Sequence, residues 1–235
     1  MRLFFKVRCL PFFFFFCLKM SLAHAQLRTM GGYNYSVANY FAVNSVIEDY
    51  NLSSPMLTQS MNSFSGLHGL NLGAQYRFGF YWVEFMWFNR FGKVSDVVQP
   101  IATNSSTYSN TLRLRNQSFA IGTAAYYQWF AIGGSVDWNV TTLKHERSFD
   151  SVSELLLDDA NFSLHVFTNF ELPPLIEGLS VNVRPYVHWP ATQLGFQGVA
   201  RKLMPVTAPN LRVNYSQRIV NFGISFMFVH GATCR

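Results

Sequence analysis

The chain has 235 residues, of which 49% are hydrophobic, 17% aromatic and only 13% charged. Soluble domains normally carry about twice that share of charge, so the composition indicates that much of the surface meets a lipid-like environment. The formal net charge is +6, but four of the 18 basic residues fall in the first 25 positions, which contain no acid, and this leaves 14 basic against 12 acidic residues. This balance removes the main support for nucleic-acid binding, so no nucleic-acid partner is expected.

Residues 1–25 are predicted to be a cleaved signal peptide. They combine a basic start, an apolar run over 10–18 and an A-x-A site at Ala23-His24-Ala25, as secretory signals do. The apolar run is shorter than the roughly 20 residues that a spanning helix needs, which disfavours a retained anchor. Bulky phenylalanines before Cys17 also disfavour a lipoprotein. After cleavage Cys234 is the one cysteine left, so neither an internal disulfide nor a cysteine metal cluster is expected.

Residues 26–235 are predicted to form one domain built from strands. After Ala25 no apolar run is long enough for a transmembrane helix, so any membrane crossing must be made by strands. Eight segments alternate, with a period of two, between large apolar residues and small or polar ones. They are 29–40, 68–78, 81–90, 111–125, 130–142, 161–170, 179–189 and 218–230.

The even strand number and the final segment predict a closed barrel. The last segment alternates regularly, with Val220, Phe222, Ile224, Phe226 and Phe228 on one face. It can pair with the first segment, so that no strand edge is left in lipid. The predicted fold class is therefore all-β, an eight-stranded antiparallel up-and-down transmembrane β-barrel of the outer-membrane type.

The connections between the segments are expected to alternate short and long. Short turns lie around Gly79, Gln128 and Pro173-Pro174, and long polar segments make the other four connections. Short periplasmic turns and long external loops are typical of these barrels.

The polar register is expected to face the lumen, because Arg or Lys on the lipid face costs about 2 to 4 kcal/mol at mid-membrane. An eight-stranded barrel is just wide enough to be filled by its own side chains, so these charges should pair and plug the lumen, with Glu171 as a further acid. A structural role in neutralising buried charge is favoured over a ligand or ion path. The predicted network consists of Arg77, Glu84, Arg90, Arg113, Arg115, Asp137 and Arg184.

The opposite register should face lipid and supply interfacial aromatic residues. These are Tyr33, Tyr81, Trp87, Trp138 and Trp189. A soluble lipocalin-like barrel has the same period with its apolar face inward, and is the structural alternative. It would expose small residues such as Gly32 and Ser225, which suit a crowded lumen better, so the membrane orientation is favoured.

Catalytic and metal-binding motifs are absent from the sequence. It contains no H-E-x-x-H, Walker, C-x-x-C or G-x-S-x-G pattern. Some eight-stranded barrels are lipid A deacylases with a His-x-Ser pair, but no histidine here is followed two residues later by a serine. His165 and His188 fall on the inward register of neighbouring strands and could bind a metal. No third ligand is indicated, so a hydrogen-bonded lumen pair is favoured. The chain is expected to be non-enzymatic, with no metal and no cofactor.

Two connecting segments have helical features. Tyr40, Val43, Ile47 and Tyr50 recur at helical spacing, and residues 151–154 form a capping box before three leucines. Either could be a helix that binds a partner, but folding over the barrel mouth is favoured.

Three short motifs carry a resemblance to known barrels. They are Asn44 with Val46-Ile47 and Tyr50-Asn51, Arg115-Asn116, and Arg184-Pro185-Tyr186. The mature chain resembles the small outer-membrane barrels of the OmpA-domain and OmpX type, and more narrowly a group of uncharacterised barrels from Bacteroidetes. This resemblance implies a fold and an outer-membrane location, not an activity. The chain departs from the usual aromatic ending, because residues 231–235 follow the last strand.

The sequence thus predicts an exported, monomeric outer-membrane barrel with a plugged lumen. It would act as a structural protein or through its external loops on an unidentified surface partner. The other expected partners are outer-membrane lipids and, during biogenesis, periplasmic chaperones and the barrel-assembly machinery. A narrow channel for small solutes and a lipid-binding or lipid-modifying barrel are the alternatives.

Overall fold

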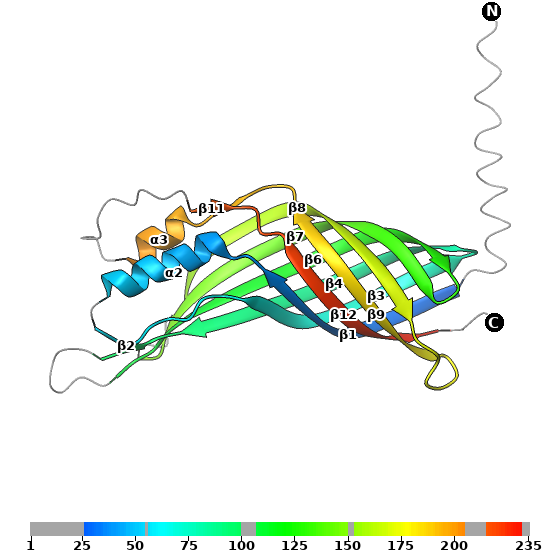
Figure 1. The fold of residues 1–235 in the computed structure, drawn as a ribbon, viewed down its shortest axis with the longest axis horizontal. Helices are drawn as coiled ribbons and strands as arrows, with labels where there is room; N and C mark the ends of the chain where they lie inside the picture. The colour runs from blue at the N-terminus through cyan, green and yellow to red at the C-terminus, as the bar shows by residue number, and fades with distance from the viewer. Residues whose placement is uncertain (1–25, 55, 100–106, 150–152, 205–214, 232–235) are drawn as a thin grey trace, which may run out of the picture.

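The computed structural model describes residues 26–54, 56–99, 107–149, 153–204 and 215–231. The predicted signal peptide and Cys234 lie outside these ranges. Eight long strands close into one antiparallel barrel (Figure 1). They are β1 (Gln26–Ala38), β3 (Gly66–Phe78), β4 (Tyr81–Ser95), β6 (Asn110–Tyr127), β7 (Phe130–Arg147), β8 (Ser153–Glu171), β9 (Leu179–Pro190) and β12 (Asn221–His230). The predicted eight-stranded up-and-down barrel is confirmed.

The barrel closes through the pairing of β1 with β12, which carries ten residue pairs from Thr29–His230 to Ala38–Asn221. Figure 1 shows these blue and red strands side by side. Each of the eight strands therefore has two neighbours, and no backbone edge is left open among them. Closure matters because an unpaired edge cannot be satisfied in hydrocarbon.

The two faces of the barrel wall differ in the sense that the sequence predicts. Large apolar side chains point outward and are exposed, for example Leu72 at 55%, Ile121 at 65% and Phe228 at 58%. Their sequence neighbours point inward and are buried, and many of them are polar, such as Asn71 and Ser225. The inverted, lipocalin-like orientation is therefore excluded for this chain.

One end of the barrel, called here the turn end, carries the short connections and both ends of the described chain (Figure 1). Two-residue turns follow β3 and β6, and seven residues join β8 to β9. Gly79 and Gln128 adopt positive φ angles of 62° and 55°, which such tight turns require and which glycine adopts without strain.

The opposite end, called here the outer end, carries the helices and the longer connections (Figure 1). The prediction of a long segment between the fifth and sixth strands is wrong, because β7 continues to Arg147 and β8 begins at Ser153. The helix predicted from the capping box is also wrong over its described part. Leu155 and Leu157 pair with β7 across a bulge. Backbone pairing with β7 is therefore favoured over the helix that the local capping box predicts.

A helical cap covers the outer end. It consists of α2 (Phe41–Ser53), α3 (Gln197–Leu203) and two small sheets, β2 (Leu57–Gln59) with β5 (Val97–Val98) and β10 (Leu194–Gly195) with β11 (Ser216–Gln217). The helix predicted from Tyr40, Val43, Ile47 and Tyr50 is confirmed as α2, and Val43 and Ile47 are fully buried. They pack with inward leucines of the barrel wall in one hydrophobic core. Within the described ranges, neither helix has the length and apolarity needed to span a membrane.

Candidate functional site

The lumen is crossed by a buried ion pair between β4 and β9. Both terminal nitrogens of Arg184 donate to the two carboxylate oxygens of Glu84, each at 2.8 Å. The exposed fractions of the two side chains are 0% and 2%. The Trp82 indole N–H donates to the same carboxylate at 3.1 Å, and the guanidinium lies 4.1 Å from the Phe167 ring centroid. This bidentate geometry fixes both side chains across the lumen.

A second ion pair lies nearer the turn end. Arg28 donates to Glu171 through both terminal nitrogens, at 3.1 and 2.5 Å, and Ser180 bonds to both partners at 3.2 Å. The sequence interpretation included Glu171 but missed Arg28, which lies two residues before the buried Met30 in β1 and therefore shares its inward register. Arg77, which was predicted in the network, lies close to the turn end, with its guanidinium 3.9 Å from the Tyr126 ring centroid.

The two predicted histidines face each other on β8 and β9, and both are buried. Nδ1 of His165 lies 3.3 Å from Oδ2 of Asp137, although the angle is not that of a hydrogen bond. Nε2 of His188 lies 2.6 Å from Ser163 Oγ and 3.0 Å from Asn139 Oδ1. The pair is thus part of a larger polar cluster, with Asp137 as its acid.

This cluster contains a serine, a histidine and an aspartate, but their contacts are not those of a hydrolase's catalytic triad. In a catalytic triad one ring nitrogen faces the serine and the other faces the carboxylate. Here Nε2 of His188 faces Ser163 and, at 3.9 Å, also Asp137. Its Nδ1 instead lies 3.5 Å from the amide nitrogen of Asn221. The described residues also contain no group of three or more His, Cys, Asp or Glu that could hold a metal ion.

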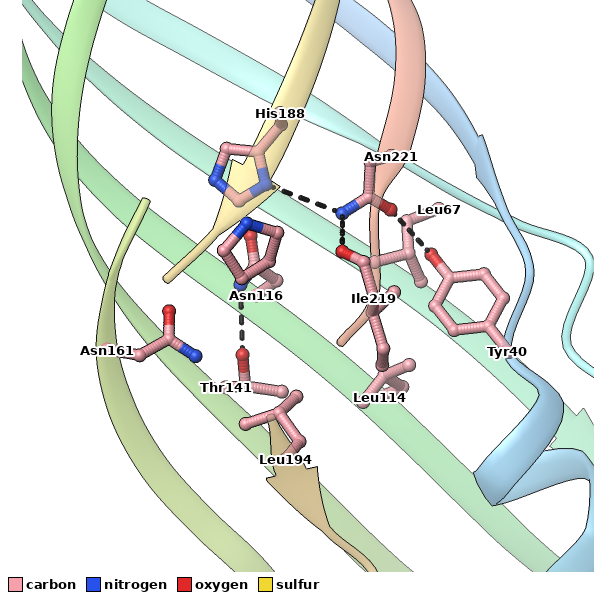
Figure 2. Close-up of a pocket in the computed structure, with 11 residues that line it drawn as sticks. Tyr40, Leu67, Leu114, Asn116, Thr141, Asn161, His188, Leu194, Ile219 and Asn221 are labelled. Atoms are coloured by element: carbon pink, nitrogen blue, oxygen red, sulfur yellow. Dashed lines mark hydrogen bonds between the residues drawn. The ribbon is translucent and has the colours of Figure 1, made fainter. Parts of the chain in front are cut away.

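A small cavity separates the lumen from the cap. Its volume is about 30 Å³, which is enough for about one or two water molecules. Figure 2 shows Asn221 between His188 and the phenol of Tyr40, which donates to the Asn221 side chain at 3.3 Å. Asn116, on the far wall, donates to Thr141 at 3.0 Å. A continuous polar contact therefore joins the histidine cluster to the first residue before α2.

Arg90 is the remaining lumen cation of the predicted network. It is 1% exposed, and one terminal nitrogen donates to Asn116 at 3.1 Å. The guanidinium also lies 4.8 Å from the Phe88 ring centroid and 5.4 Å from that of Tyr186. Aromatic faces stabilise such a cation without a carboxylate partner.

The lumen prediction is wrong for Arg113 and Arg115, which point outward from β6. The Arg113 side chain is 55% exposed and pairs with Glu146 at 2.9 Å, while Arg115 donates to Asn89 at 2.8 Å in an exposed contact. The cause is a change of polarity along β6. Near the outer end the inward positions are Leu112 and Leu114, which join the hydrophobic core under the cap, so the arginines between them face out.

All five predicted interfacial aromatic residues lie on the outward register. Tyr33, Tyr81, Trp138 and Trp189 are 43% to 52% exposed, and Trp87 is half-buried. Trp87, Phe119 and Trp138 form a row across β4, β6 and β7. Tyr81 begins β4 and Trp189 lies next to the end of β9, whereas Trp87 and Trp138 lie in the middle parts of their strands. An interfacial position stays a prediction for this set.

Asparagine side chains of α2 connect the cap by hydrogen bonds to the segment that precedes β3. Asn44 exchanges two hydrogen bonds with the backbone of Phe64, at 2.9 and 2.8 Å. Asn51 makes the same pair with Met61, at 2.9 and 3.0 Å. These asparagines belong to a motif behind the sequence resemblance, and their role here is to hold the chain before β3 against the helix.

Two tyrosines make further hydrogen bonds that hold the cap in place. The Tyr50 phenol donates to Asp96 at 2.8 Å and accepts from Asn110 at 2.9 Å. Burial, reinforced by the neighbouring Asp96 carboxylate, raises the Tyr50 pKa well above its ordinary value. The Tyr215 phenol donates to Asp49.

Comparisons with known proteins give only distant likenesses. No protein-family model matches the chain, and no curated protein does. Solved structures similar to it include Ail, the attachment invasion locus protein of Yersinia pestis, in complex with the heparin analogue sucrose octasulfate (TM-score 0.42, 10% identity, 88% of this chain and 97% of that one). Neisserial surface protein A has a TM-score of 0.43 and 8% identity over 88% and 97% of the chains. The outer membrane protease OmpT of Escherichia coli has a TM-score of 0.32 and 8% identity over 88% and 94%. The assignment of the fold rests on the strand pairing itself.

Proposed function

We propose that this chain is an integral outer-membrane protein with a closed lumen, which acts without enzymatic activity through its outer end. Its role would be structural or would lie in contact with a surface partner. The observation that carries the proposal is the combination of an exposed apolar outer wall with a lumen that is crossed by the Glu84–Arg184 pair and capped by a hydrophobic core.

The apolar wall has the height of a membrane. On β4 the outward residues from Tyr81 to Phe91 carry no charge. This stretch is about 34 Å long along the strand, or about 26 Å along the membrane normal at a tilt of about 40°, close to the apolar band of about 25 Å in such barrels. Burial in water-free hydrocarbon explains why so many phenylalanine, leucine and tryptophan side chains remain uncovered by protein.

The closed lumen favours a non-conducting protein over the alternative of a narrow solute channel. A path along the axis would have to pass the Arg28–Glu171 and Glu84–Arg184 pairs. It would then have to pass the apolar core that α2 and α3 form with the barrel wall. Ions pass such an apolar seal only at a high desolvation cost.

Enzymatic activity finds no support in the geometry. The buried Ser163, His188 and Asp137 lack a triad's contacts, and they face the lumen rather than lipid. Apolar residues cover most of the wall, so a partner in water would be met at an end of the barrel, and the outer end offers the larger surface because it carries the cap. Phe41 and Leu52 of α2 are 61% and 80% exposed there.

The test uses the full-length protein in washed outer membranes and after reconstitution. We expect it to resist carbonate extraction, and to migrate differently in electrophoresis before and after boiling. In planar bilayers it should give no single-channel current. Recovery as a soluble protein without a mobility shift would overturn the membrane assignment. A steady current that changes in Glu84→Ala would instead establish the channel alternative, and altered acylation of lipid A upon overexpression would establish a lipid-modifying enzyme.

A further inference from the structure

Four cations form an outward patch near the outer end of three adjacent strands. This outer basic patch consists of Lys93 on β4, Arg113 and Arg115 on β6, and Lys144 on β7. Strand register places Lys93 directly opposite Arg113, and Arg113 directly opposite Lys144. All four side chains line one groove on the barrel wall.

The charge in this groove is poorly balanced. Among the described residues Glu146 is the one acid that lines it, and its carboxylate pairs with Arg113 at 2.9 Å. On β8, Asp158 borders the patch opposite Thr142. Neither Lys93 nor Lys144 has an ion pair with a described acidic group. The four cations and Glu146 leave a local excess of about three positive charges.

Such a row is unfavourable unless an anion is present. Residues directly opposite each other on paired strands have Cβ atoms about 5 Å apart, and like charges there destabilise the pair. A phosphate oxygen cluster between them would reverse the sign of the interaction, and arginine in particular binds phosphate with two parallel hydrogen bonds. The patch therefore has the form of an anion site.

The height of the patch identifies the source of the anion. On β4, β6 and β7, moving from the turn end, every outward residue is uncharged until Lys93, Arg115 and Lys144. These are therefore the first charges above the apolar wall, where lipid headgroups lie. The neighbouring Phe91 ring packs on His68 at a centroid distance of 4.4 Å and extends the apolar wall up to the patch.

We propose that the outer basic patch binds the phosphate groups of a glycolipid in the outer leaflet, with the acyl chains against the apolar wall below. The inference rests on the proposed membrane orientation. We propose a lipid rather than a soluble polyanion as the ligand, because the cations lie directly above the apolar part of the barrel wall and not on the cap.

The experiment compares wild type with the triple variant Lys93→Gln, Arg113→Gln and Lys144→Gln. The matched control replaces three exposed cations of the cap side, Arg201→Gln, Lys202→Gln and Arg218→Gln. Each purified protein is reconstituted into phosphatidylcholine nanodiscs containing either diphosphorylated lipid A or its dephosphorylated form, and the retained lipid A is counted by native mass spectrometry.

Wild type and control should enrich the diphosphorylated lipid at least about tenfold over the triple variant, since each cation near an anionic lipid surface contributes roughly fivefold in affinity. The dephosphorylated lipid should show no enrichment. Equal retention by wild type and triple variant would overturn the proposal, as would equal retention of the two lipids. Stronger competition by free inorganic phosphate or heparin than by lipid A vesicles would assign the patch to a soluble anion and also overturn it. The boiling shift, read on the same samples, separates these results from a failure of the membrane assignment.

Discussion

Breaking the buried ion pair of the lumen should cost far more than breaking an exposed pair of the same chemistry. The change is Glu84→Gln, which is nearly isosteric and leaves the Arg184 guanidinium at 0% exposure without its carboxylate. Removing one partner of a buried pair typically costs about 3 to 5 kcal/mol, because the other charge stays desolvated. The matched control is Glu146→Gln, whose partner Arg113 is 55% exposed, and for which less than about 1 kcal/mol is expected.

A double variant separates charge burial from packing. Glu84→Gln with Arg184→Met removes both charges and keeps most of the volume, so it should recover most of the loss. The free energy of unfolding is measured by urea titration of protein refolded in phosphatidylcholine vesicles, with the boiling-sensitive electrophoretic form as readout. A loss in Glu84→Gln below about 1 kcal/mol, or a double variant as unstable as the single one, would refute the assignment of Arg184 to a sealed, pair-dependent lumen.

Three further predictions test the packing of the barrel wall and the attachment of the cap. In Gly133→Ala the new Cβ would lie 2.5 Å from the nearest side-chain carbon, whereas Gly195→Ala meets nothing within 4 Å. The first should lower the unfolding free energy by about 1 to 3 kcal/mol and the second should leave it nearly unchanged, and equal effects would contradict the close packing of the wall. Asn51→Ala removes two hydrogen bonds to Met61 and should speed limited proteolysis of the cap severalfold while the boiling shift of the barrel stays. Tyr50→Phe leaves a buried carboxylate short of a donor, at a cost of about 1 to 3 kcal/mol, seen as earlier loss of cap protection in hydrogen exchange. An unchanged exchange profile would show that the tyrosine does not hold the cap.

The number of strands, their order and the face on which most side chains lie could be predicted from the sequence. In a strand, residues alternate between two faces with a period of two, so the local pattern of apolar and polar residues distinguishes the two environments. The closing strand is the clearest case, since Phe222, Phe226 and Phe228 all lie outward as their spacing predicts. The helix around Val43 and Ile47 was readable for the same reason, at helical period.

The partners of the lumen charges were not readable, because pairing depends on which strands close on each other. Glu84 and Arg184 are 100 residues apart, and Arg28 and Glu171 are 143 apart. The alternation showed that Glu84 and Arg184 face inward. It gave no information about which acid meets which base across the barrel. Arg28 was missed because the first segment was predicted to begin at residue 29, whereas β1 begins at Gln26.

The sequence by itself determined a barrel of eight strands with an apolar outside, since local alternation is enough to specify which face each residue takes. The tertiary structure alone decided where that rule reverses. Above the apolar wall the cap supplies a hydrophobic core inside the barrel, so Leu112 and Leu114 turn inward and Arg113 and Arg115 face out without any break in the strand's phase. On β4 the same kind of alternation places Glu84 and Arg90 in the lumen and, nearer the cap, Lys93 on the outer surface, and only the position of the cap distinguishes the two cases.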